Sequence, residues 1–236
     1  MLLKLNIIDS PPGGGLILAE VIEEEKNMKH EWRKIEKEIY VPKNKPELIS
    51  IPPFKYFIIE GKGNPNDDFF AEYIGVLYSL SYAVRMSHKA GLAPKNYFEY
   101  TVYPLEGIWD ISEEAKKNNS GVLDKDSLVF NLMIRQPDFV TDQFAQDIIE
   151  KTKKKKPHEL LSKVKFGKIK DGDCVQMTHL GPFSNETESF KQMEQFCKEN
   201  NLTRESKQHR EIYLSDVRKV NPEKLKTALR FKVNKE

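Results

Sequence analysis

Cysteines and metal-binding motifs are scarce in this chain. Only Cys174 and Cys197 occur among its 236 residues, which argues against a disulfide-stabilised fold and predicts two reduced thiols in a cytosolic protein. The five histidines are scattered, and no His-Glu-x-x-His or Cys-x-x-Cys motif is present to hold a structural zinc. A Gly-x-Ser-x-Gly motif is also missing, which disfavours an ordinary serine hydrolase. We therefore expect neither a metal nor a cofactor.

Charge of one sign and long hydrophobic runs are equally scarce. The chain has 38 Lys and Arg against 36 Asp and Glu, so no global positive field draws it to nucleic acid or to a membrane. The lysines at 153–156 end a predicted helix, where the helix dipole and solvent favour cations. No window approaches the ~18 apolar residues of a membrane span, and the N-terminus lacks the features of a secretory signal. We expect a cytoplasmic protein that binds neither nucleic acid directly nor membrane.

The first 27 residues differ in composition from the rest. They contain Pro11-Pro12-Gly13-Gly14-Gly15, but no Gly-Lys-Ser/Thr follows, so a phosphate-binding loop is disfavoured. The glutamates at 23–25 lie just upstream of Met28, and their codons can spell a purine-rich ribosome-binding sequence. We hypothesise that translation starts at Met28. Residues 1–27 are then an extension, and residues 28–236 form a single domain.

What the chain does contain is an internal duplication. The order strand, helix, strand, strand occurs twice, over about 48–138 and about 164–234. Glu99 and Glu211 begin equivalent strands 112 residues apart (211 − 99), a period typical of a duplicated half-domain rather than of a short-repeat solenoid. The sequence therefore predicts an α+β fold of two similar units. The expected strands are 54–61, 99–103, 127–135, 174–179, 211–215 and 226–233, and the expected helices are 27–40, about 68–91, 141–156 and 185–198.

The two glutamate strands carry the candidate site. Because side chains alternate along a strand, Glu99 and Tyr103 share one face of the first strand, and Glu211 and Tyr213 share one face of the second. We expect Ile212 to face its own helix, so that Glu211 lines a pocket between the copies. Most strand glutamates are simply exposed to solvent, but the aromatic residues nearby favour a pocket. A carboxylate among aromatic rings can act as base, acid or counter-ion.

Several motifs resemble those of one known family. The turn His179-Leu-Gly-Pro-Phe183 and the strand Arg210-Glu-Ile-Tyr-Leu-Ser-Asp216 lie in the second copy. Together with motifs of the first copy, they resemble the GyrI-like small-molecule-binding family, which also provides the effector module of multidrug-sensing transcription regulators. The resemblance covers roughly residues 28–233, and it departs from the family pattern at Phe183, where the family often has tyrosine. The first-copy motifs are 75–78, 97–109 and 133–138.

The resemblance implies two strand-helix-strand-strand units related by a pseudo-two-fold, with a central cleft for bulky, often aromatic or cationic ligands. It also implies that Glu211 is the pocket carboxylate. The chain resembles stand-alone members of the family that hydrolyse cyclopropane-bearing, DNA-alkylating natural products. In that reaction, water opens a strained ring that is conjugated to a dienone. In that chemistry Glu211 would activate the water, Tyr103 or Tyr213 would donate to the developing phenolate, and Trp109 would stack on the ligand. The remaining ligand-binding candidates are Tyr78, Glu99, His179 and Phe183.

Two other functions stay open at this point. A drug-sequestering or sensing protein would use the same pocket, with Glu211 as counter-ion, and turnover beyond one equivalent separates it from an enzyme. A protein-interaction role, such as restraining a topoisomerase, is suggested by members of the wider family and is tested by a pull-down against gyrase. A self-contained transcription factor is disfavoured, because a helix-turn-helix domain needs ~50 residues or more ahead of the first strand. The oligomeric state is also open.

Overall fold

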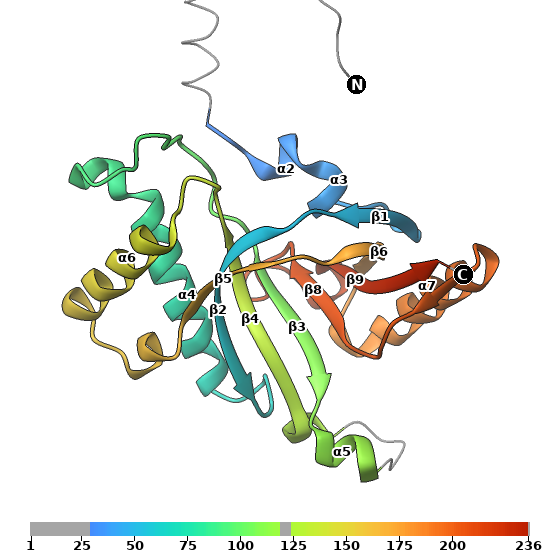
Figure 1. Ribbon diagram of the computed structural model, residues 1–236. Helices are drawn as coiled ribbons and strands as arrows, with labels where there is room; N and C mark the ends of the chain where they lie inside the picture. Colours follow the sequence, from blue (N-terminus) through green and yellow to red (C-terminus); the bar gives the residue numbers. More distant parts are fainter. Residues whose placement is uncertain (1–28, 119–123, 236) are drawn as a thin grey trace, which may run out of the picture.

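The computed structural model describes residues 29–118 and 124–235 (Figure 1). The proposed extension 1–27 and the proposed start at Met28 lie outside these residues. The helices are α2 (Trp32–Ile35), α3 (Lys37–Tyr40), α4 (Phe69–Arg85), α5 (Glu113–Asn118), α6 (Asp142–Lys155) and α7 (Glu186–Glu199). The short 3-10 turns are Ser87–Ala90, Lys125–Ser127, Glu159–Ser162, Phe183–Asn185 and Pro222–Lys224.

The strands form one curled antiparallel sheet in the order β1-β6-β9-β8-β3-β4-β2-β5, with β7 paired to β9. The duplication is confirmed, because β1-β2-α4-β3-β4 and β5-β6-α7-β8-β9 repeat the same order, apart from the short β7 between α7 and β8, and β3 pairs with β8 at the centre. The strands are β1 (Glu47–Ile51), β2 (Phe54–Lys62), β3 (Leu105–Ile111), β4 (Leu128–Gln136), β5 (Lys165–Ile169), β6 (Gly172–Leu180), β7 (Leu202–Arg204), β8 (His209–Tyr213) and β9 (Lys226–Lys235).

Two bends curl this sheet into a half-barrel. Between β1 and β2 the chain bends at Pro52 and Pro53, which cannot donate to a strand ladder. A matching bend between β5 and β6 includes Asp171. The pairing register is the same on both sides of the bends, because β1 pairs with β6 and β2 with β5 along one continuous antiparallel ribbon. This ribbon joins the two ends of the sheet and brings the two halves into the half-barrel seen in Figure 1.

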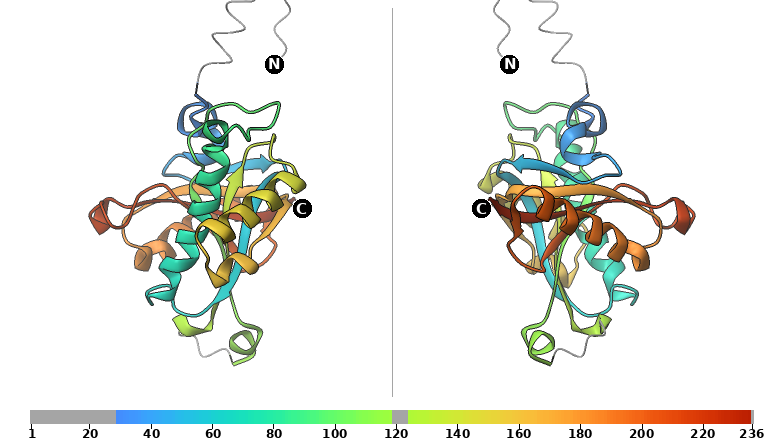
Figure 2. Two further views of the ribbon diagram at one scale, coloured as in Figure 1. Left: turned by 90° about the vertical axis from the view of Figure 1, so that its left-hand side faces the viewer. Right: turned by 90° about the vertical axis from the view of Figure 1, so that its right-hand side faces the viewer.

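Helices α4 and α7 cover the same face of the sheet (Figure 2). Direct cross-strand partners share a face, and one such row runs across five strands, joining both halves. At the first-half end of this row the apolar side chains pack in the core that includes α4 and α6, and at the other end they pack under α7. The middle of the row, between the two helices, holds a glycine and a glutamate. Its members are Leu132, Gly107, Glu211, Leu229 and Met177.

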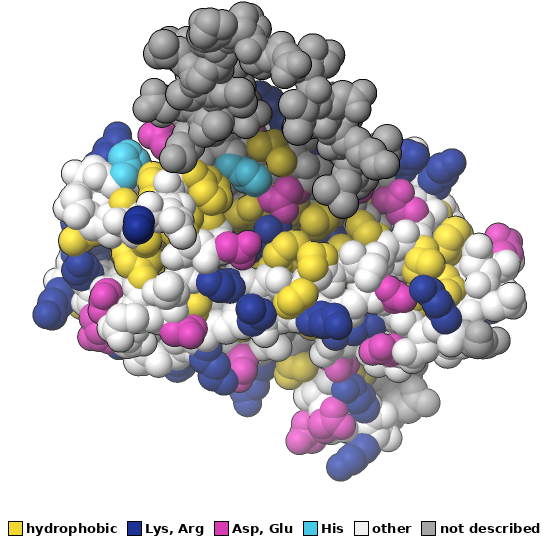
Figure 3. Space-filling view, turned by 45° about the horizontal axis from the view of Figure 1, so that its top comes forward, with side chains coloured by type: hydrophobic (Ala, Val, Ile, Leu, Met, Phe, Trp, Pro, Cys, Tyr) yellow, Lys and Arg dark blue, Asp and Glu magenta, His cyan; other side chains and the backbone are white. Residues whose placement is uncertain are grey.

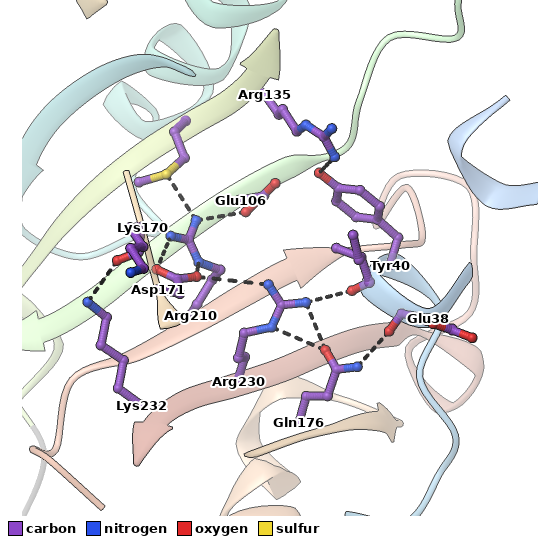
Figure 4. Close-up of polar contacts among 12 residues, drawn as sticks. Glu38, Tyr40, Glu106, Arg135, Lys170, Asp171, Gln176, Arg210, Arg230 and Lys232 are labelled. Carbon is purple, nitrogen blue, oxygen red and sulfur yellow. Dashed lines mark hydrogen bonds and ion pairs between the residues drawn. The ribbon is translucent and has the colours of Figure 1, made fainter. Parts of the chain in front are cut away.

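The opposite face of the sheet holds a buried group of charged side chains, which we call the inner cluster (Figure 4). Arg210 donates to both Asp171 oxygens, at 2.8 and 2.9 Å, and to Glu106 at 2.7 Å. Arg230 donates to the Gln176 side-chain oxygen at 2.8 and 3.1 Å. Helix α3 closes this face, since Gln176 and Arg230 also donate to its backbone carbonyls. The face of the sheet away from α4 and α7 is therefore filled by the inner cluster and α3.

Two sequence predictions fail, one within the first repeat and one in the segment before it. The predicted strand 99–103 is a loop with a single bridge from Tyr100 to His30, and the strand begins only after Pro104, at Leu105. The predicted helix 27–40 is two short helices separated at Glu36. The Glu36 carboxylate turns inward to meet Arg135, which breaks the regular helix. The helices α4, α6 and α7 are confirmed.

The described surface mixes charges of both signs. Figure 3 shows Lys and Arg side chains interspersed with Asp and Glu on the face drawn, without a continuous basic surface. In the parts of the chain that the structure describes, no helix combines the length and apolar character needed to cross a membrane.

Candidate functional site

Strand β8 places three polar side chains in the middle of the helix-covered face. Residues two apart on a strand point the same way, so His209, Glu211 and Tyr213 lie together on the side of α4 and α7. The sequence predicted that Glu211 would face away from the helix and Ile212 toward it, and this prediction is wrong. The other face is taken by the inner cluster, which requires Arg210 to point inward and places Ile212 in the core beside it.

Trp109 and Tyr213 form the aromatic side of the site. They come from the adjacent strands β3 and β8, and the Trp109 indole N–H donates to the Tyr213 hydroxyl at 2.9 Å. The indole packs against Phe70 of α4, with ring centroids 5.8 Å apart. Gly107 makes this position possible, because a Cβ there would lie 2.6 Å from the indole nitrogen. Burial, together with the charge of Glu211 and the hydrogen bond that Tyr213 donates to it, raises the pKa of Tyr213.

Glu186 is the site residue that the sequence analysis missed. It lies in the first turn of α7, where a glutamate ordinarily serves only the helix dipole. Here it is 8% exposed, and its Oε1 has no hydrogen-bond partner among the described residues. Burial and the nearby charge of Glu211 raise the pKa of Glu186 to about 9. The only signal in the sequence was its place three residues after Phe183, at the end of the matched turn.

Glu211, 9% exposed, is held by donors on both sides. Tyr213 donates to it from one side, and the His209 ring nitrogen lies 3.2 Å from its Oε1 on the other. The His209 ring packs edge-on against Phe190 of α7, with ring centroids 4.8 Å apart. We call Trp109, Glu186, Glu211 and Tyr213 the central site. It combines a carboxylate held in place, a protonated carboxyl and a phenol beside a planar indole.

The other second-half candidates frame the central site. Phe183 is exposed, and its ring meets that of Tyr213 edge-on with centroids 6.0 Å apart. His179 has a structural role, because its ring nitrogens bond Ser189 at 2.9 Å and the Pro182 carbonyl at 3.1 Å. These two bonds tie the Gly181-Pro182 turn to α7.

The first-half candidates are split by the structure. Tyr78 of α4 is half-buried, and its hydroxyl accepts from the backbone of Leu105 on β3 while burial raises its pKa. Tyr103 belongs to a different group, because its hydroxyl donates to Glu36 at 2.7 Å and Arg135 lies over its ring. The Glu99 side chain is 61% exposed, beside His88. The structure therefore brings neither Tyr103 nor Glu99 to the central site.

The site is expected to make the stability of the protein depend on pH through Glu186. An unfolded glutamate titrates near 4.3, so between about pH 5 and pH 9 only the folded protein keeps this proton. The free energy of unfolding should therefore fall as the pH rises, by at most about 1.4 kcal/mol per pH unit. Glu186→Gln removes this loss, and the variant should become more stable relative to wild type between about pH 6 and pH 8.

Urea unfolding of both proteins at the two pH values measures this effect. Glu188→Gln is the matched control, because Glu188 lies in the same turn but is exposed and paired with Lys191. An identical pH dependence for wild type and Glu186→Gln would contradict a protonated Glu186.

Comparison with known proteins gives the chain clear relatives. The GyrI-like small molecule binding domain matches residues 44–234. A hydrolase encoded by lin2189 from Listeria innocua is 37% identical, with a TM-score of 0.80 over 88% of this chain and 100% of that chain. Another hydrolase structure from Listeria innocua is 36% identical, with a TM-score of 0.78 over 87% of this chain and 100% of that chain.

A more distant structure shares only the fold. The EcmrR C-terminal domain is 11% identical, with a TM-score of 0.51 over 81% of this chain and 98% of that chain. No curated protein matches the chain. The family match spans most of the sequence and includes both repeats, and the Listeria structures are matched over their whole length. This chain therefore belongs to the GyrI-like small molecule binding domain family.

Proposed function

We propose that the central site binds a bulky aromatic or cationic small molecule, and that the protein hydrolyses cyclopropane-bearing, DNA-alkylating compounds and so protects the cell. The observation that carries this proposal is the pair of buried carboxyl groups, Glu186 and Glu211, beside the Tyr213 hydroxyl and the Trp109 indole. The two Listeria relatives described as hydrolases support a hydrolytic reaction.

The reaction adds one water molecule across one carbon–carbon bond. The water oxygen bonds to a cyclopropane CH2 carbon, and the bond from that carbon to the dienone ring breaks. The released electron pair makes the ring aromatic and leaves a phenolate oxygen. One proton of the water goes to a base, and an acid gives one proton to the phenolate. No electrons are gained or lost overall, and relief of ring strain drives the step.

The residues of the central site divide this work. Glu211 takes the proton from water, since it is held in place and is already an acceptor of hydrogen bonds. Tyr213 donates to the phenolate oxygen, and Glu186, which keeps its proton at neutral pH, is a second donor. The Trp109 indole stacks on the planar ligand. Tyr103, the alternative donor, has its hydroxyl bonded to Glu36.

A non-catalytic drug-binding protein is the second candidate. A carboxylate beside an indole and a phenol is also a suitable counter-ion for an aromatic cation. The two functions share every residue of the central site, so the number of turnovers distinguishes them.

The experiment is hydrolysis of a spirocyclopropyl dienone, followed by the loss of dienone absorbance in the ultraviolet. The substrate is supplied in at least tenfold excess over the protein. Product beyond one equivalent is expected of an enzyme. Binding without product, or product that stops at one equivalent, leaves a sequestering protein.

A further inference from the structure

The two carboxyl groups of the central site are unequally supplied with hydrogen-bond donors. Glu211 receives the Tyr213 hydroxyl and lies 3.2 Å from a His209 ring nitrogen. Glu186 is buried on the opposing helix, and its Oε1 has no partner among the described residues. A buried carboxylate without donors is strongly disfavoured, whereas a buried neutral carboxyl costs much less. The geometry therefore assigns the negative charge to Glu211 and the proton to Glu186.

Few other titratable groups face this pair of carboxyl groups. On β8 they are His209 and the hydroxyl of Tyr213, and on β3 the facing residue is the uncharged Trp109. From β6, His179 faces α7, but its two ring nitrogens are taken up by Ser189 and Pro182. Among the described residues, no lysine or arginine forms an ion pair with Glu186 or Glu211 in this structure. A positive charge that enters the site is therefore a new partner for Glu186.

We infer that the central site exchanges a proton for an organic cation: an aromatic cation that binds beside Glu211 makes Glu186 release its proton to solvent, and the site then holds two carboxylates. The inference rests on the ligand site of the proposed function and deepens it. The exchange balances, since one positive charge enters and one proton leaves. Without the cation two adjacent carboxylates repel each other, so one proton is retained.

The exchange gives the two ligand classes different responses to pH. Release of one proton makes cation affinity increase about tenfold per pH unit, as long as Glu186 is protonated in the free protein. A neutral aromatic ligand displaces no proton, and it binds with little dependence on pH over the same range. The same site can therefore bind neutral dienones while Glu186 keeps its proton and bind cations more tightly as the pH rises.

Calorimetry with tetraphenylphosphonium tests the exchange, because the charge of this aromatic cation cannot titrate. Titration at about pH 7 in phosphate and in Tris, buffers with different ionisation enthalpies, gives the number of protons released. We expect about one proton per cation bound to wild type and none for Glu186→Gln. Triphenylphosphine oxide, a neutral compound of similar shape, should release none from either protein.

The inference is overturned if wild type binds the cation without proton release, or does not bind it at all. It is also overturned if Glu186→Gln releases as many protons as wild type, because the proton then comes from His209 or another group. Turnover of the neutral dienone is measured separately. Proton exchange without turnover rejects the hydrolase alone, and turnover without proton exchange rejects this inference alone.

Discussion

Glu211→Gln is expected to lower the turnover of a spirocyclopropyl dienone by about 10²- to 10⁴-fold, the usual contribution of a positioned general base. Glutamine keeps the size of the side chain but cannot take a proton from water. The amide oxygen can still accept the hydrogen bonds from Tyr213 and His209. The affinity for a neutral ligand should therefore change much less than kcat. Stopped-flow absorbance at saturating substrate measures the loss.

Glu99→Gln is the matched control for this substitution. Glu99 and Glu211 are the two glutamates that the sequence placed at equivalent strand starts, but the Glu99 side chain is 61% exposed. The control should keep the wild-type kcat. A hydrolase that keeps its full kcat in Glu211→Gln would contradict the assignment of Glu211 as the base. An equal loss in both variants would place the chemistry elsewhere.

The same assay decides between the two candidate tyrosines. Tyr213→Phe removes the hydroxyl that lies between Trp109 and Glu211, and kcat is expected to fall by about 10²-fold. Tyr103→Phe removes a hydroxyl bonded to Glu36, so it should affect stability and leave kcat near that of wild type. Loss of kcat in Tyr103→Phe alone would reverse this assignment.

The parts of the site that the sequence predicted are those set by local pattern. Alternation along β8 correctly places Glu211 with Tyr213. The matched turn made Phe183 a ligand-binding candidate, and the structure adds that its ring contacts that of Tyr213. Alternation does not decide which face of the sheet meets the helices. That choice depends on Arg210, which is buried with Asp171 from the bend between β5 and β6. Arg210 and Asp171 are 39 residues apart in the sequence, so the alternation pattern of a single strand cannot predict their contact.

Local sequence patterns also gave wrong predictions where a tertiary contact determines the structure. The run at 99–103 has strand-like alternation, but it finds no neighbouring strand apart from one bridge to His30. The sequence around Glu36 has a helical pattern, but the Glu36 carboxylate accepts a hydrogen bond from Tyr103 and pairs with Arg135 inside the protein. Glu186 looked like an ordinary first-turn glutamate, and only the position of Glu211 across from α7 makes it part of a site.

The inner cluster links the two repeats through buried charges. Arg210 belongs to the second repeat, Glu106 to the first, and Asp171 to the bend between β5 and β6. Burial alone would raise the pKa of Asp171, but the charge and hydrogen bonds of Arg210, together with the charges of Arg230 and Lys232, outweigh it and hold that pKa below its usual value. Burial raises the pKa of Glu106 despite the same arginine. The central site lies on the other face of these strands, so its geometry depends on this cluster.

Arg210→Met is expected to lower the free energy of unfolding by about 3–5 kcal/mol, because it leaves the buried Glu106 without its ion-pair partner and Asp171 with only the more distant Arg230. The Arg210 side chain is 4% exposed and donates to both Glu106 and Asp171. Urea unfolding at about pH 7 measures the loss. Asp171 has a lowered pKa in the folded protein, so its contribution is present above about pH 4 and is lost as the pH falls below that value.

Arg218→Met is the matched control, since Arg218 pairs with Asp216 at the surface and its side chain is 82% exposed. Its loss should stay below about 1 kcal/mol. The double variant Arg210→Met, Glu106→Gln removes both partners of one ion pair and should recover part of the stability lost in Arg210→Met, because Asp171 still pairs with Arg230 at 3.9 Å and no unpaired charge remains. Recovery would identify the unpaired Glu106 carboxyl as the source of the loss, whereas a further additive loss in the double variant would show that Arg210 and Glu106 act independently. In the first case the lost stability comes from a charge balance that Glu106 of the first repeat shares with Arg210 of the second.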